Sequence, residues 1–496
     1  MILIKSYSFF YFITVFHTRT IYMVVKTSRG NAKTRKHKPA AAATVASKIT
    51  CSDMTMCITF GTETKKIEKM FNFANFKNIV GIRNIAAGKS GIINELIYEC
   101  EGYRTASILK SNLDTSNEKY LADNLYYEGY IGLKYINRLA QQYPCFLKTY
   151  GLYLYNDPKL QQTFEQVNAI AEKFPDKYAE FINIIPHNVF KKLPIPKKFD
   201  ANSSCALYGQ YAIQLEYINA PISLSTLINT QMSPYFYFVE LPQIIFQIYS
   251  VLGSLSSKEA YAHNDLHIGN ILIYIVPDDK HITLTYKNAV GGATIQFQTR
   301  YIVKIIDYGR NFVPEMNPIF KQLCKAPKCK PNCGVNNGYL NIFDESYDPL
   351  PTRHNTTYDC IALYNMSSRI RKYYDRLPTG HNLIGSKNDP ILNILLKFKF
   401  NKVWPLTTEY VSQPYPKRKP SDFNVFNTIS NISNLPEIHC VCDIYWTMFY
   451  YLHSSSIYKA YKHAFIASGH KYNSSGEINC DLEYTPTHIR PLTYSV

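Results

Sequence analysis

The chain has 496 residues, of which 46% are hydrophobic, so it is long enough for two or three lobes with sizeable cores and too apolar for a disordered protein. Lysine and arginine number 54 against 37 acidic residues, which gives a formal net charge of +17. Most of the 12 cysteines are scattered, a pattern typical of reduced thiols in a cytosolic compartment and not of a small disulfide-rich secreted fold.

The N-terminal segment, residues 1–70, is predicted to be a basic, disordered tail. No acidic residue precedes Asp53, whereas nine basic residues do. Such a tail could bind nucleic acid, an anionic surface or a nuclear import receptor, or could serve only to keep the chain soluble. The apolar run at its start is too short to span a membrane, and it lacks the small residues of a signal-peptide cleavage site. The sequence from Met23 onward is more ordinary, so translation could start at Met1 or at Met23. No other stretch is predicted to cross a membrane.

The next part of the chain, up to residue 218, is predicted to be rich in strands with one long helix. Strand-like apolar patterns cover residues 79–111, 145–155 and 205–218, and helical spacing covers residues 117–143. A polar segment punctuated by proline, at about 156–205, is predicted to be an insertion.

Beyond Pro221 the pattern changes to predicted helices, of which residues 238–260 form the clearest example. An alternating stretch at 281–309 contains the pair Gly291-Gly292, and this combination predicts a β-hairpin. The proline-rich residues 412–423 are predicted to form a linker or loop.

A polar cluster stands out in this second half. The segment HNDLHIGN, residues 263–270, places Asp265 and Asn270 directly before an apolar run, and IIDYG, residues 305–309, places Asp307 directly after another. Carboxylate and amide oxygens are the hard ligands that Mg²⁺ requires, and a further carboxylate can orient the proton of a nucleophile. We therefore expect Asp265 to orient an acceptor hydroxyl, and Asn270 and Asp307 to hold a metal ion, at one phosphoryl-transfer site.

Together with motifs upstream, this cluster resembles the protein-kinase-like superfamily. HNDLHIGN matches the catalytic-loop pattern His-x-Asp-x-x-x-x-Asn, and DYG matches the Asp-Phe-Gly triplet with Tyr308 for Phe. AAGKSG resembles the glycine-rich loop, ASILK ends at the position of the strand lysine, Lys110, and Glu128 suits its helix partner. QLEYI, residues 214–218, resembles the segment that binds adenine through its backbone, and Asp359 resembles the buried aspartate of the large C-lobe helix.

The resemblance implies an α+β, bilobal fold. A small, mostly antiparallel β N-lobe with one long helix is expected at residues 71–218, and a larger, mostly α-helical C-lobe with a C-terminal extension at 219–496. ATP is the implied phosphate donor and Mg²⁺ the implied metal. The implied roles are catalytic for Asp265, Lys110 and Glu128, nucleotide-binding for Ala86, Gly88, Gly91, Lys110, Glu216, Ile218 and His267, and metal-binding for Asn270 and Asp307.

Within the superfamily, the segment YYEGYIGLKYINRLAQQYPCFLKTYG is similar to divergent serine/threonine kinases of large cytoplasmic DNA viruses. This similarity implies transfer of the γ-phosphate of ATP to Ser/Thr hydroxyls of protein substrates. It implies a location in the host cytoplasm or the virion if the protein is viral, and in the cytoplasm otherwise, with the nucleus as an alternative because of the basic tail.

Some positions depart from the protein-kinase pattern. Asn264 replaces the arginine that usually receives an activation-loop phosphate, which suggests independence of loop phosphorylation. His267 replaces a phosphate-contacting lysine, as in small-molecule phosphotransferases, and an Ala-Pro-Glu motif is missing. A small-molecule or lipid-headgroup kinase is therefore an alternative within the superfamily, and a catalytically inactive scaffold is an alternative of another class.

Two further motifs suggest other kinds of site. AAGKS ends like a Walker A loop, but that motif needs glycine where Arg83 stands. Cys324, Cys329 and Cys333, with His354 or another residue as a fourth ligand, could bind zinc. Their spacing is wider than in most zinc sites, and free thiols are the preferred interpretation.

Overall fold

The computed structural model describes the central part of the chain, with several internal gaps. The described residues are 64–88, 91–111, 125–140, 143, 145–155, 164–166, 169, 173, 189–195, 211–231, 233, 235–259, 261–276, 281–287, 294–313, 358–360, 362–363, 365–366, 420–425, 434–436, 438 and 440–467. The predicted basic arm before Thr64, the three cysteines at 324–333 and the C-terminal residues after Ala467 lie outside them.

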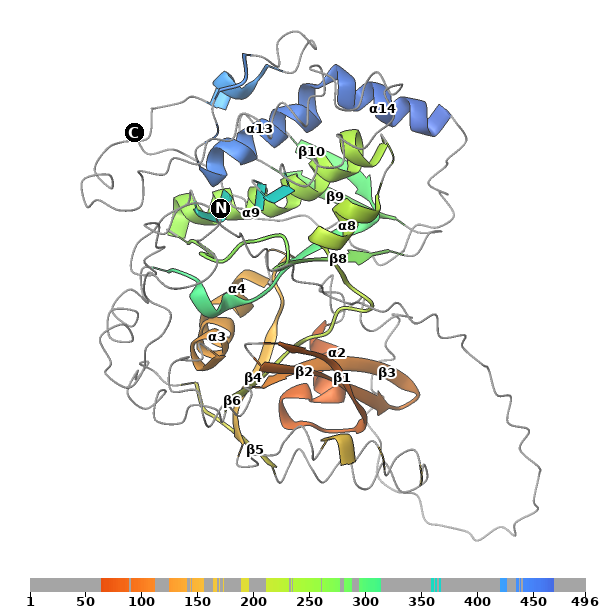
Figure 1. Ribbon diagram of the computed structural model, residues 1–496, viewed down its shortest axis with the longest axis vertical. Helices are drawn as coiled ribbons and strands as arrows, with labels where there is room; N and C mark the ends of the chain where they lie inside the picture. Colours follow the sequence, from red (N-terminus) through yellow and green to blue (C-terminus); the bar gives the residue numbers. More distant parts are fainter. Residues whose placement is uncertain are drawn as a thin grey trace, which may run out of the picture. The chain divides into compact units, whose positions relative to one another are not determined.

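The first half of the chain builds one antiparallel sheet of six strands (Figure 1). Its strands, in the spatial order β1-β2-β3-β6-β4-β5, are β1 (Ile79–Gly88), β2 (Gly91–Cys100), β3 (Tyr103–Ser111), β6 (Tyr211–Glu216), β4 (Thr149–Tyr155) and β5 (Phe190–Lys192). The strands predicted from the sequence are confirmed. Strand β5 pairs with β4 although it lies inside the segment predicted to be an insertion, so part of that segment belongs to the sheet.

A helical segment packs on this sheet, as expected for residues 117–143. It runs through α3 (Leu125–Ile131), one π-helical turn η2 (Gly132–Ile136) and α4 (Asn137–Ala140). Two glycines allow its close approach. A Cβ atom on Gly129 would lie 2.7 Å from Ile213 Cγ2, and one on Gly132 would lie 2.1 Å from Thr149 Oγ1. Any larger residue at either position would push the helix, and with it Glu128, away from the sheet.

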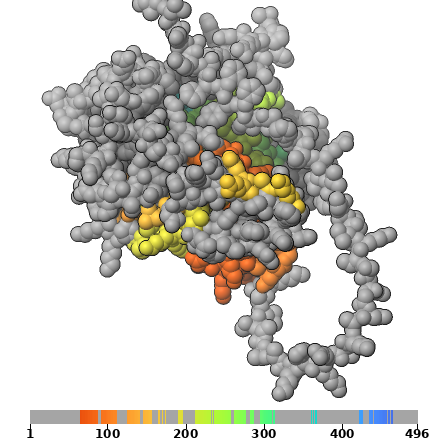
Figure 2. All heavy atoms as spheres, turned by 60° about the horizontal axis from the view of Figure 1, so that its bottom comes forward, coloured from red at the N-terminus to blue at the C-terminus, as the bar shows by residue number. Residues whose placement is uncertain are grey.

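The folded part of the chain begins before the strands, within the segment predicted to be tail. Helix α2 (Thr64–Phe71) and the short helix η1 (Phe73–Asn75) pack on the sheet, with Ile67 and Phe71 fully buried. The ring of Phe73 stacks on Tyr150 with centroids 4.7 Å apart. Residues 64–70, which were predicted to belong to the tail, therefore form part of the fold. Figure 2 shows the beginning of the described chain, in red-orange, at the surface of the face turned forward.

The second half contains most of the helices. They are α8 (Leu224–Thr230), η3 (Phe236–Glu240), α9 (Leu241–Glu259), α13 (Val441–Ser454), α14 (Ser456–Ala467) and the short turns η4 (Tyr308–Arg310), η7 (Tyr358–Cys360) and η8 (Pro420–Phe423). Helices α9 and α13 pack side by side, and Trp446 of α13 is buried (Figure 1). Among the described helices, one, at Phe236–Ser256, is long and apolar enough to cross a membrane, and the apolar window that passes this test is buried entirely inside the protein.

Short strands complete this half. The predicted hairpin is confirmed, because β9 (Ile282–Lys287) and β10 (Thr294–Thr299) pair antiparallel. Strand β8 (Ile271–Ile275) lies between β7 (Ile222–Ser223) and β11 (Tyr301–Ile305), and the pairing of Ile271 with Ile305 closes one end of this ribbon. The candidate site lies at that end.

Candidate active site

Three charged side chains from distant parts of the chain meet at one point. The Nζ atom of Lys110 on β3 lies 2.6 Å from Oε2 of Glu128 on α3 and 3.4 Å from Oδ1 of Asp307, which follows β11. The side chains of Lys110, Glu128 and Asp307 are 14%, 4% and 37% exposed. The most accessible of the three is thus the carboxylate that the sequence assigns to the metal.

The alternation of strand β3 directs Lys110 to this point. Within β3 the side chains at Leu109 and Ser111 are buried and those at Ile108 and Lys110 are partly exposed, so the last two share a face. Lys110 pairs with Ile93 of β2 and with Ile213 of β6, and this register fixes its position along the strand. A slip of one residue in either pairing would turn the ammonium group to the opposite face.

The two expected metal ligands emerge at the same end of the β8–β11 ribbon. Asn270 immediately precedes β8, Asp307 closely follows β11, and the Ile306 amide donates to the Asn270 carbonyl at 3.0 Å. The side-chain Nδ2 of Asn270 donates to the Asp265 carbonyl at 2.9 Å. This bond directs the amide nitrogen toward the loop and leaves Oδ1, the hard donor, at the other end of the group. The donor set of Asn270 and Asp307 therefore fits Mg²⁺ chemically.

The loop that carries Asp265 is braced by a buried carboxylate, as expected for Asp359. Its Oδ2 accepts from the His263 amide at 2.7 Å, and its Oδ1 accepts from the Asn264 amide at 2.8 Å. Asn264 has a φ of 62° and Asp307 a φ of 68°, in the left-handed region that asparagine and aspartate tolerate better than most residues. Both bends lie beside the candidate catalytic groups, where strained backbone is often found.

His263 is fixed between the loop that carries Asp265 and the turn that carries Asp307. Its Nε2 lies 3.1 Å from the carbonyl oxygen of Ile306, which can only accept, and its Nδ1 accepts from the Asp265 amide at 3.3 Å. Both contacts are satisfied by the neutral ring with its proton on Nε2. Burial lowers the pKa of His263 to about 4, against a smaller raising effect of Asp307. His263 therefore braces the loop as a neutral ring.

Burial raises the pKa of Asp359 to about 7, although its two backbone hydrogen bonds act to lower it. Because the ordinary value is 3.8, the folded state binds this proton more tightly than the unfolded state, so its contribution to stability is present at low pH and is lost as pH rises toward 7. Replacement by asparagine mimics the protonated form. We expect the stability of wild type relative to Asp359→Asn to fall by about 1.4 kcal/mol per pH unit between pH 4 and 7.

Urea unfolding of both proteins at several pH values measures this difference. All other groups, including His263, titrate in both proteins, so their contributions to the free energy of unfolding cancel when the two proteins are compared. If the free energies of unfolding of wild type and Asp359→Asn changed with pH in parallel, Asp359 would not change its protonation in this range.

The residues expected in the glycine-rich loop lie on the first hairpin. Ala86 and Gly88 lie at the end of β1, Gly91 opens β2, and Gly88 pairs directly with Gly91. The two residues between them lie outside the described part of the chain. Gly91 has a φ of 142°, which L-residues with a side chain rarely adopt. The hairpin is also irregular between Asn84 and Ala86.

The other two expected nucleotide-binding segments are ordered by different contacts. Ile218 is buried, and the Glu216 side chain is buried in an ion pair with Lys304, 2.9 Å from Nζ to Oε1, so any contact of Glu216 with a base would come from its backbone. The Nδ1 atom of His267 accepts from the Gly269 amide at 3.0 Å. In the neutral ring the donor of His267 is therefore Nε2.

Sequence reasoning missed several polar residues beside the site. Lys304 stands in the buried strand YIVKI, and a lysine inside such a run is the signal that could have marked it. The hydroxyl of Tyr308 accepts from the Leu147 amide at 2.7 Å and donates to the Ile305 carbonyl at 2.7 Å. The signal for Tyr308 was present too, as the one change in the Asp-Phe-Gly triplet.

The described residues contain no cluster of three or more histidine, cysteine or acidic side chains arranged to hold a metal ion. Cys440 and Cys442 are both free thiols, and burial raises the pKa of Cys442's neighbour Cys360 well above its ordinary value. The proposed zinc ligands Cys324, Cys329 and Cys333 fall outside the described residues.

No family model and no curated protein matches the chain. Among solved structures, a crystal structure of a kinase domain is similar to it at 16% sequence identity with a TM-score of 0.21. The match covers 48% of this chain and 52% of that one, so the chain spans about half the length of the kinase domain it matches.

Proposed function

We propose that the protein is an ATP-dependent kinase with a bilobal, protein-kinase-like fold, which transfers the γ-phosphate to Ser/Thr hydroxyls of proteins. The observation that carries this proposal is the meeting of Lys110, Glu128 and Asp307. Residues separated by 18 and 197 positions along the chain converge on one ammonium group. A surface ion pair needs no such convergence, whereas a phosphate site needs a fixed cation beside a metal-binding carboxylate.

Each residue has one role in this proposal. Glu128, buried on α3, fixes the Lys110 ammonium so that it can hold the nucleotide phosphates. Asp265 accepts or orients the proton of the acceptor hydroxyl. Asn270 and Asp307 would hold Mg²⁺, which when bound neutralises phosphate charge. The contact between Lys110 and Asp307 is close enough for both to serve the same triphosphate.

The glycine-rich hairpin and the segment from Glu216 to Ile218 supply the remaining nucleotide contacts in this proposal. Gly88 and Gly91 carry no side chain, so their backbone can approach the phosphates. The carboxylate of Glu216 is engaged with Lys304, which leaves adenine to be bound by the backbone of this segment. The basic residues that precede Asp53 are assigned to anionic partners such as nucleic acid.

One observation favours a second candidate, a kinase of small molecules or lipid headgroups. His267 stands where a lysine would contact the γ-phosphate, and the hydrogen bond from the Gly269 amide leaves Nε2 as its donor. A neutral imidazole binds phosphate less firmly than an ammonium group, and its charge depends on pH.

The decisive experiment incubates the purified full chain with γ-³²P-ATP and Mg²⁺ and a panel of acceptors. The panel contains a basic protein, an acidic protein, and the small alcohols choline and an aminoglycoside. We expect label on serine or threonine of a protein, identified by phosphoamino-acid analysis. Label on a small alcohol alone would favour the second candidate. Nucleotide binding without any transfer would favour an inactive scaffold and would contradict both.

A further inference from the structure

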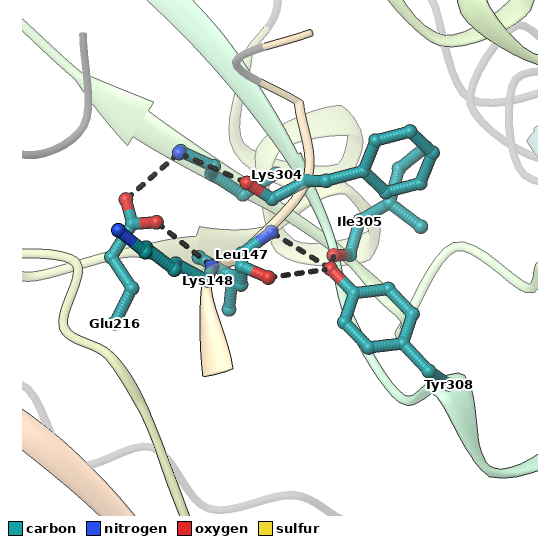
Figure 3. Close-up of polar contacts among 7 residues, drawn as sticks. Leu147, Lys148, Glu216, Lys304, Ile305 and Tyr308 are labelled. Carbon is teal, nitrogen blue, oxygen red and sulfur yellow. Dashed lines mark hydrogen bonds and ion pairs between the residues drawn. The ribbon is translucent and has the colours of Figure 1, made fainter. Parts of the chain in front are cut away.

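A buried polar network joins three segments behind the candidate site (Figure 3). Lys304 Nζ lies 2.9 Å from Glu216 Oε1, and Glu216 Oε2 accepts from the Lys148 amide at 3.0 Å. The backbone of the same residues is paired as well, because the Glu216 amide donates to the Lys148 carbonyl at 2.8 Å. In Figure 3 the Glu216 carboxylate lies between the Lys304 ammonium and the Lys148 backbone.

The same segment is fastened to the metal-binding turn. The Leu147 amide donates to the Tyr308 hydroxyl, and this hydroxyl donates to the Ile305 carbonyl, each at 2.7 Å. The Ile305 amide in turn donates to the Cys145 carbonyl at 2.6 Å. The side chain of Tyr308 is fully buried. Residues 145–148 are thus bonded on one side to the expected base-binding segment and on the other to the turn that presents Asp307.

Stability alone does not account for this arrangement. The side chains of Lys304 and Glu216 are 1% and 4% exposed, so both charges have lost their hydration. The attraction within such a pair roughly offsets that loss, and apolar replacements of buried pairs are often neutral or stabilising. The pair does fix the relative orientation of the segments, because the two oxygens of the planar Glu216 carboxylate bind two fixed partners, the Lys304 ammonium and the Lys148 amide. An apolar contact would hold the same segments together without setting their register.

We propose that Lys304, Glu216 and Tyr308 are positioning residues of the kinase reaction. They fix the base-binding segment at residue 216 relative to the metal-binding turn at residue 307, using residues 145–148 as the common anchor. In the proposed complex the nucleotide contacts both segments. The network therefore sets the distance between the segment that binds the base and the turn that holds the metal ion beside the γ-phosphate. This proposal rests on the proposed function.

Two sets of substitutions test it. Tyr308→Phe removes one hydroxyl and keeps the ring. Lys304→Met combined with Glu216→Gln removes both charges, and the glutamine can still accept from the Lys148 amide. We expect each protein to fold and to show a KM for ATP raised about tenfold with a reduced kcat, because small displacements of reacting groups are costly. The KM for the acceptor protein stays unchanged.

A matched control separates positioning from simple loss of stability. Gln243 on α9 donates to the Tyr458 hydroxyl on α14 at 3.0 Å in a buried contact that belongs to neither segment. Tyr458→Phe should lower the Tm comparably to Tyr308→Phe and leave both kinetic constants unchanged. Hydrogen exchange gives a second readout, since the amides of Leu147 and Lys148 should exchange faster in the two site variants only.

The outcomes are distinct. Wild-type KM, kcat and amide exchange in the folded Tyr308→Phe protein and in the double variant would overturn the positioning role while leaving the proposed kinase function intact. A wild-type protein that binds no nucleotide and transfers no phosphate would overturn the proposed function, and the positioning role with it.

Discussion

Asp265→Asn should reduce phosphate transfer at least about a hundredfold while nucleotide affinity stays close to that of the wild type. The substitution keeps the size of the side chain and removes the carboxylate that accepts the proton, a contribution of about 10² to 10⁴ in rate. The loop itself should persist, because the contacts that shape it use the backbone of Asp265. Its amide donates to His263 Nδ1 and its carbonyl accepts from Asn270.

The measurement compares transfer of γ-³²P from ATP with binding of a non-hydrolysable ATP analogue by calorimetry. Tyr458→Phe, far from these residues in the sequence and on helix α14, serves as the control for handling and folding. Wild-type turnover in Asp265→Asn would exclude this carboxylate as the proton acceptor. A parallel loss of binding and transfer would assign it to nucleotide binding.

Lys110→Met should abolish detectable transfer and also destabilise the fold. It removes the ammonium group that contacts both Glu128 and Asp307, and loss of one electrostatic group of this kind costs about 10² to 10³ in kcat. It also leaves the Glu128 carboxylate, 4% exposed, without its lysine, which costs about 3 to 5 kcal/mol for a buried pair. Urea unfolding measures the second effect and the radiolabel assay the first.

The double variant Lys110→Met with Glu128→Leu distinguishes the two effects. It removes the buried charge as well, so we expect unfolding free energy to recover toward the wild-type value. Transfer should not recover, because no cation is restored to the phosphates. Recovery of both would mean that the lysine acts only through stability, and the phosphate role of Lys110 would then be wrong.

Much of the local structure could be predicted because the relevant signals are short in range. The strand-like apolar pattern over residues 79–111 predicts strands, and the structure forms β1, β2 and β3 there. The polar cluster at residues 263–270 could be located for the same reason, since it interrupts apolar runs. The resemblance to protein kinases then assigned these segments to two lobes and to one shared site.

What could not be predicted depends on contacts between distant segments. The apolar run around Lys304 marks this lysine as unusual, but its partner could not be named from the sequence, because Glu216 lies 88 positions away. Helix α2 was assigned to the tail because basic residues dominate the sequence before it. Its burial depends on Ile67 and Phe71 meeting a sheet that begins only at Ile79. Short amphipathic helices carry too little pattern to reveal this.

The docking of helix α2 has a practical consequence for recombinant production. A fragment that starts at the first strand would lose Ile67, Phe71 and Phe73 and expose the aromatic rings of Tyr98 and Tyr150, which Phe73 covers. It would also lose the ion pair of Glu68 with Lys148, the residue of the 145–148 anchor whose backbone is bonded to Glu216. Such a fragment should aggregate on expression, whereas one that starts ahead of Thr64 should remain dispersed.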